Sequence, residues 1–170
     1  MLSGRHLLPA QMLHRILLPL FLLAASASAL AQPVPNIRIA SKGAWTADCT
    51  PEAQTGEKWC QAGTVLRSSN PPYSLEFNYV RDSRMFFARG SMPLSGVHAQ
   101  VEGHSVFDFD RCLAGMCLLK GAPADQLLTQ MRAGGRLMLR FDTRAQLPGP
   151  LTVDLADFDA MYRAALAAPK

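Results

Sequence analysis

Apolar and polar residues alternate with a period of two along most of the chain after residue 45. Leu75, Phe77 and Tyr79, for example, are separated by Glu76 and Asn78. A period of two places successive side chains on opposite faces of a strand, so it predicts a strand with one buried face. Alternation and short apolar runs predict strands at residues 45–49, 59–67, 75–80, 85–88, 97–101, 105–110, 116–120, 136–142 and 151–155. Strands spaced this regularly predict a mainly β fold, an antiparallel β-sandwich or barrel-like sheet in a single domain.

Two segments near the C-terminal end show the helical period instead. The first begins at Pro123, which suits the first helical position, carries Asp125 in its first turn and ends at Gly134. The second begins at Asp157, which is expected to cap it. Their apolar faces consist of Leu127, Leu128 and Met131 in the first and Phe158, Met161, Tyr162, Ala165 and Leu166 in the second. We expect both short helices to pack on the sheet.

The first 31 residues have the composition of a secretory signal peptide. The basic residues Arg5 and Arg15 precede an apolar run at residues 16–25. Small residues then lead to Ala31. The run is shorter than the about 20 apolar residues that a membrane-spanning helix needs, which disfavours a retained anchor. We therefore expect residues 1–31 to be a signal peptide that is cut after Ala31.

Removal of this segment from the 170-residue chain leaves 139 residues, the size of one ordinary domain, whether translation starts at Met1 or at Met12. Two prolines and a lack of periodicity predict an extended N-terminal arm at residues 32–42, followed by the domain at 43–168. Two of the 17 basic residues leave with the signal peptide, so 15 basic side chains face 13 acidic ones, a net charge of +2. These charges are scattered, unlike the basic clusters of nucleic-acid-binding proteins. We expect no nucleic-acid partner and no membrane span in the mature chain.

The four cysteines lie in the part of the chain that is expected to be exported, where disulfides persist. An even number fits two bridges, and of the three possible pairings the sequential one closes the shortest loops. Spacers of ten and four residues match neither a zinc ribbon nor a two-residue redox motif. The sequence between the last two, Leu-Ala-Gly-Met, favours a tight turn. We therefore expect structural disulfides made by Cys49, Cys60, Cys112 and Cys117.

Residues suited to catalysis are few. The only histidines of the mature chain are His98 and His104, and neither lies in a nucleophile motif, so both are interpreted as exposed residues beside turns. Asp108 and Asp110 share one face of a predicted strand and could act as paired carboxylates. The aromatic residues that alternate with them along the strand place both aspartates on the solvent side instead. We expect a salt bridge to an arginine, Arg111 or Arg140, and no catalytic residue.

Metal binding is a further alternative. Thioether sulfurs, with an occasional imidazole, select Cu(I) in exported proteins. The methionines concerned are Met85, Met92, Met116, Met131, Met138 and Met161. No two of them form a Met-x-Met or Met-x-x-Met unit, and no acidic loop with calcium-ligand spacing is present. We expect no metal and no cofactor, with copper carriage as a minor alternative.

Several segments together resemble the invasion-associated locus B family of Gram-negative bacteria. They are Gly43–Cys49, Cys60, Phe109–Cys117, Leu128–Gly134 and Leu155–Ala160. The chain departs from the family pattern at three positions, where it carries Ala44, Met116 and Asp157. The resemblance implies a small β-rich protein of the periplasm or outer envelope, linked in some members to host-cell invasion or colonisation, without established catalytic residues.

These observations favour a non-enzymatic protein that binds an envelope or host macromolecule. The sequence does not identify the binding residues. A periplasmic carrier of a small ligand or of copper is the alternative, and a hydrolase or redox enzyme is a third possibility. The oligomeric state and the partner carry no sequence signal.

Overall fold

A computed structural model describes residues 36–52, 54–69, 72–109, 111–113, 115–142 and 149–169. All of them belong to one compact unit, Val34–Lys170. The expected signal peptide at residues 1–31 lies outside the described residues.

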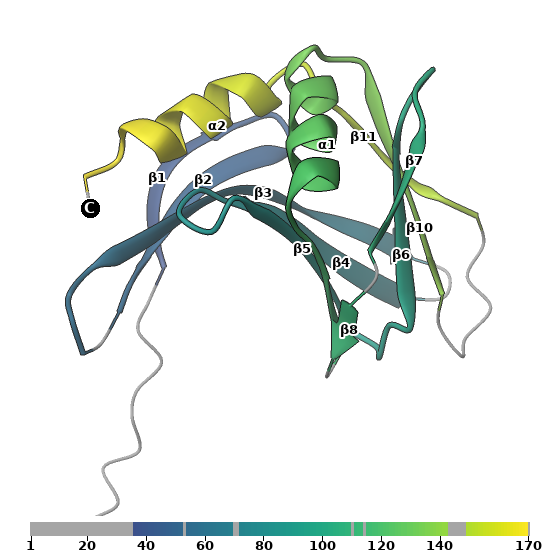
Figure 1. Cartoon of the computed structure of the whole chain (residues 1–170), viewed down its shortest axis with the longest axis horizontal. Coiled ribbons are helices and arrows are strands. Elements are labelled where there is room, and N and C mark those ends of the chain that lie inside the picture. The colour runs from purple at the N-terminus through teal and green to yellow at the C-terminus, as the bar shows by residue number, and fades with distance from the viewer. Residues whose placement is uncertain are drawn as a thin grey trace, which may run out of the picture. The chain divides into compact units, whose positions relative to one another are not determined.

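Eleven strands form two antiparallel sheets in the part of the chain that is described (Figure 1). The larger sheet has the order β1-β2-β3-β4-β5-β9-β8 and the smaller one β11-β10-β6-β7. The larger sheet contains β1 (Ile37–Lys42), β2 (Trp45–Pro51), β3 (Lys58–Ser69), β4 (Pro72–Val80), β5 (Met85–Gly90), β8 (Arg111–Leu113) and β9 (Met116–Leu119). The smaller sheet contains β6 (Gly96–Val101), β7 (Val106–Phe109), β10 (Arg136–Asp142) and β11 (Leu151–Asp154). The mainly β, antiparallel fold predicted from the alternation is confirmed.

The two helices are α1 (Ala122–Arg132) and α2 (Phe158–Ala167). Helix α2 packs on strands β1, β2 and β3, while α1 contacts α2 and β6 (Figure 1). Pro123 lies in the first turn of α1, as expected, and Asp125 binds Arg84 at 2.9 Å. None of the described helices is long and apolar enough to cross a membrane.

The start of the second helix differs in detail from the prediction. Asp157 occupies the capping position of α2, but its side chain accepts no hydrogen bond from the backbone N–H groups of the helix. Its carboxylate binds Lys42 Nζ at 2.9 Å instead, which joins the helix start to strand β1. Leu166, predicted on the packed face, is 46% exposed, whereas Phe158, Met161 and Ala165 are buried as expected.

Two strands were not predicted. Residues 32–42, expected to form an arm before the domain, include β1, which pairs with β2 from Ile37 opposite Cys49 to Lys42 opposite Trp45. A register shift between Arg38 and Ala40 breaks the alternation of this edge strand, which hides it from a period-two pattern. Strand β8 has three residues and forms only because the adjacent turn brings it against β9.

The core lies between the sheets and beneath the helices. Trp45 is 1% exposed, meets the Phe158 ring edge-on at 4.9 Å, and donates a hydrogen bond from Nε1 to the Asp154 carbonyl at 2.7 Å. It therefore joins β2, β11 and α2. Aromatic pairs connect the two sheets, with Tyr73 stacked on Phe141 at 4.9 Å.

Candidate functional site

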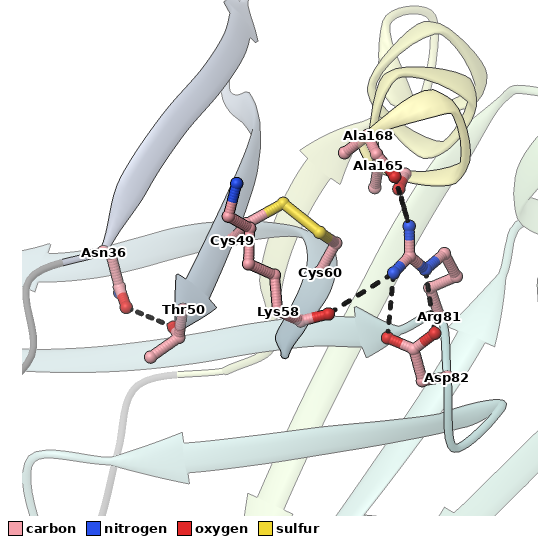
Figure 2. Close-up of a disulfide and its surroundings, with 9 residues drawn as sticks. All are labelled: Asn36, Cys49, Thr50, Lys58, Cys60, Arg81, Asp82, Ala165 and Ala168. Carbon is pink, nitrogen blue, oxygen red and sulfur yellow. Dashed lines mark hydrogen bonds and ion pairs between the residues drawn. A yellow bond between two sulfur atoms is a disulfide. The ribbon is translucent and has the colours of Figure 1, made fainter. Parts of the chain in front are cut away.

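The four cysteines form the two sequential disulfides. Cys49 and Cys60 lie directly opposite each other on β2 and β3, and Cys112 and Cys117 do so on β8 and β9. Figure 2 shows the first bridge between its strands. The tight turn expected between the second pair is confirmed, with Gly115 at φ +79°, a conformation that favours glycine. No cysteine of the chain is left as a free thiol for metal or redox chemistry.

A buried arginine fixes the C-terminal end of helix α2. The Arg81 side chain is 9% exposed and donates hydrogen bonds to the carbonyls of Ala165 at 3.1 Å and Ala168 at 2.8 Å (Figure 2). It also reaches the Lys58 carbonyl at 3.4 Å and pairs with Asp82 at 3.0 Å. The last carbonyls of a helix have no partner within the helix, so the guanidinium satisfies acceptors that would otherwise be unpaired.

Replacing Arg81 by alanine is expected to lower the free energy of unfolding by about 2–3 kcal/mol, the range for hydrogen bonds to a charged group. Chemical denaturation of Arg81→Ala beside the wild type measures the loss. Arg81→Lys keeps the charge but not the fork of donors, so this variant is expected to recover only part of the lost unfolding free energy. Equal stability of Arg81→Ala and wild type would show that these hydrogen bonds contribute nothing.

The outer face of the seven-stranded sheet, which points away from the core, carries a groove of about 550 Å³. Strand register sets its layout, because Gln61 pairs with Val80 and Val80 with Met85 across β3, β4 and β5. A second row runs from Glu76 through Arg89 to Met116 on β9. We call this the outer-face groove. Its lining residues include Trp59, Gln61, Val80, Met85, Phe87 and Met116.

The floor of the outer-face groove is apolar and one polar group in it lacks a partner. Phe87 and Val80 are 7% and 5% exposed, while Trp59 and Met116 stand partly open at 39% and 37%. Gln61 is 5% exposed, and its Oε1 has no hydrogen-bond partner among the described residues. An unpaired buried acceptor is costly and uncommon in native proteins, so it marks a place where a donor from outside would be favourable.

An acidic hollow of about 360 Å³ adjoins the groove. It is lined by Glu52, Glu57, Lys58, Trp59 and Asp82. Trp59 and Asp82 belong to both hollows, so the apolar groove continues into the acidic one. Among the side chains that line it, the carboxylates of Glu52 and Glu57 outnumber the one cation, Lys58, while Asp82 pairs with Arg81.

The groove residues were missed because alternation assigns every second residue of a half-buried strand to solvent. The sequence did carry one local signal that the outer face of these strands is covered. Tyr79-Val80 and Phe86-Phe87 are adjacent apolar pairs, which indicate strands that are covered on both faces.

His98 was expected to be an exposed residue beside a turn, whereas its side chain is partly buried, at 32% exposed. It lies within β6, where Nδ1 is 2.7 Å from Asp108 Oδ1 on β7 and Nε2 is 3.2 Å from Asp142 Oδ2 on β10. Asp108 thus pairs with a histidine and not with the arginine that was expected, and Asp110 lies outside the described residues. Both ring nitrogens are occupied by carboxylates on opposite sides, so neither is left to activate a nucleophile. His104 is exposed in a turn, as expected.

The hydrogen bond to Asp108 has the largest effect on the pKa of His98 and raises it above the ordinary value of 6.5. Burial, the next largest cause, lowers this pKa, and the hydrogen bond to Asp142 raises it again. A raised pKa means that this stabilisation is complete below about pH 6.5 and is lost as the pH rises through the folded-state value. His98→Gln is expected to remove this dependence between about pH 6 and about pH 8. The effect is less than about 1 kcal/mol, because the carboxylates are largely exposed and screened. Denaturation curves at both pH values test it, and identical pH slopes for the two proteins would contradict it.

The six methionines are distributed over different elements of the fold. Met131 and Met161 are buried in the faces of α1 and α2, whereas Met85 and Met116 lie on different strands of the outer-face groove. Within the described ranges, no group of three His, Cys, Asp or Glu side chains is arranged to hold a metal ion.

Comparisons of the chain with known protein families, with curated proteins and with solved structures find no match.

Proposed function

We propose that this protein is an exported, non-enzymatic binding protein of the periplasm or outer envelope, and that it binds a macromolecule through the outer-face groove. The observation that carries this proposal is the groove itself, an open and mainly apolar surface with an unpaired polar group on the outer face of the sheet. Exposed apolar surface of this kind is a feature of interaction sites. Both disulfides suit an oxidising compartment, and the N-terminal residues have the composition of a signal peptide.

The absence of catalysis is also part of the proposal. Of the two histidines that the composition offers as bases, His98 has both ring nitrogens engaged by carboxylates and His104 is exposed in a turn. The cysteine sulfurs are engaged in disulfides. The resemblance to the invasion-associated locus B family supports an envelope location and a role in host-cell invasion or colonisation.

A second candidate function is carriage of a small apolar ligand. The volume of the outer-face groove, about 550 Å³, lies in the range of small-molecule sites. Ligand that stays with the mature protein through purification, identified by mass spectrometry after denaturation, would favour this candidate over macromolecular binding.

Affinity capture with matched variants tests the proposal. Trp59 and Val106 are equally exposed, at 39% and 40%, but only Trp59 lines the groove. Immobilised wild type and Val106→Ala are expected to retain the same macromolecule from envelope extract or host-cell extract, and Trp59→Ala to retain at least about tenfold less, since an anchor aromatic contributes 2 kcal/mol or more. Equal retention by all three proteins would rule out the groove as the binding surface.

A further inference from the structure

Resting on the proposed function, we infer that the outer-face groove binds an extended peptide segment in which a basic residue adjoins apolar residues. The apolar residues lie over the groove, and the basic side chain lies in the acidic hollow beside Trp59.

The dimensions of the groove fit an extended chain. Its apolar floor crosses four neighbouring strands, β9, β5, β4 and β3, and Thr50 extends the lining to a fifth, β2. Neighbouring strands lie about 4.8 Å apart, so the floor is roughly 14 Å across, which is the length of about four extended residues. A free amine or a single amino acid would fill only one end of it.

The unpaired amide of Gln61 indicates the chemistry of the β3 end of the floor. Its Oε1 accepts no hydrogen bond within the described chain, although the residue is only 5% exposed. An extended peptide presents a backbone N–H at every residue that is not proline. After a small rotation of the Gln61 side chain, one of these donors satisfies the acceptor at the floor, which an aliphatic lipid chain could not do.

Charge sets the preference for a side chain just beyond this end, in the acidic hollow. Glu52 and Glu57 are exposed on the loop between β2 and β3, next to the partly open indole of Trp59. A cation is attracted both by carboxylates and by the face of an indole. A lysine or arginine of the peptide gains from both, whereas an acidic residue is repelled. The other charged pair of the groove, Glu76 with Arg89 at 2.5 Å, is internally neutralised and adds no preference.

Calorimetric titration of the mature protein with blocked tetrapeptides tests this inference. The probes are acetyl-Lys-Leu-Val-Leu-amide and acetyl-Leu-Val-Leu-Lys-amide, their counterparts with Glu in place of Lys, and butylamine. One of the lysine peptides is expected to bind at least about tenfold more tightly than its glutamate counterpart at low salt, with a smaller ratio at high salt. Butylamine is expected to bind far more weakly than that peptide.

Three variants assign the contacts. Gln61→Leu is expected to weaken the lysine peptide about fivefold, in the range of one neutral hydrogen bond. The double change Glu52→Gln with Glu57→Gln is expected to abolish the preference for lysine over glutamate while leaving apolar binding in place. Val106→Ala serves as the control and is expected to change nothing, and thermal melts confirm that each variant is folded.

Equal affinity for the lysine and glutamate peptides, no binding of any peptide, or butylamine binding as tightly as the peptides would each overturn the peptide inference. None of these results would affect the capture experiment, in which a loss on Trp59→Ala still identifies the groove as the binding surface. Failure of that capture, by contrast, would overturn the proposed function itself.

Discussion

Replacing Trp45 by alanine is expected to lower the free energy of unfolding by about 3–5 kcal/mol, the range for removing a large buried aromatic side chain. Trp45 is 1% exposed and contacts the Phe158 ring at 4.9 Å, so its loss leaves a cavity between the sheet and helix α2. It also leaves the Asp154 carbonyl without its indole donor. This is a large fraction of the about 5–15 kcal/mol that holds a domain folded. Urea denaturation monitored by circular dichroism measures it.

Trp45→Phe separates the two contributions. Phenylalanine keeps most of the aromatic contact with Phe158 but cannot donate to the Asp154 carbonyl, so the expected loss is about 1–3 kcal/mol. A Trp45→Ala variant as stable as the wild type would show that α2 does not depend on this packing. Trp45→Phe as destabilised as Trp45→Ala would show that the hydrogen bond, and not the ring contact, dominates.

Removal of both disulfides is the second large effect. The bridges join residues 11 and 5 positions apart, and the chain-entropy relation assigns them about 3 and about 2 kcal/mol. The variant with all four cysteines changed to alanine is therefore expected to lose roughly 5 kcal/mol, comparable with the whole stability of a marginal domain. Denaturation curves of this variant and of each double variant measure the contributions.

The two double variants act as controls for each other. Cys49→Ala with Cys60→Ala is expected to be the more damaging change, because its bridge closes the longer loop and both sulfurs are buried in the core. Mass spectrometry of unreduced wild type is expected to show a mass four hydrogens below that of the reduced chain. Four free thiols in freshly isolated exported protein would contradict the disulfide assignment.

The local pattern of apolar and polar residues was sufficient to predict most strands of the two sheets. Leu137 and Leu139 on β10 are fully buried, as expected from their alternation with Arg136, Met138 and Arg140. The disulfide turn could also be predicted, because a glycine between two cysteines in a chain that is expected to be exported has few other interpretations. In each case the information lies within a few neighbouring residues.

The features that were missed depend on partners distant in sequence. Strand β1 exists because β2 offers it an edge, and its own alternation is broken. His98 meets Asp108 and Asp142, which are 10 and 44 residues away, only because β6 pairs with both β7 and β10. The outer-face groove likewise needs the register of four strands, and no segment of the sequence carries it alone.

Site-specific photo-crosslinking tests the central claim, that the outer-face groove is the working surface, most directly. Benzoylphenylalanine is placed at Trp59 in one variant and at Val106, on the other sheet, in a second, and each exported protein is irradiated in intact cells or in contact with host cells. The expected result is a discrete macromolecular adduct at position 59 and none at position 106. Adducts of equal yield at both positions, or at position 106 alone, would contradict it.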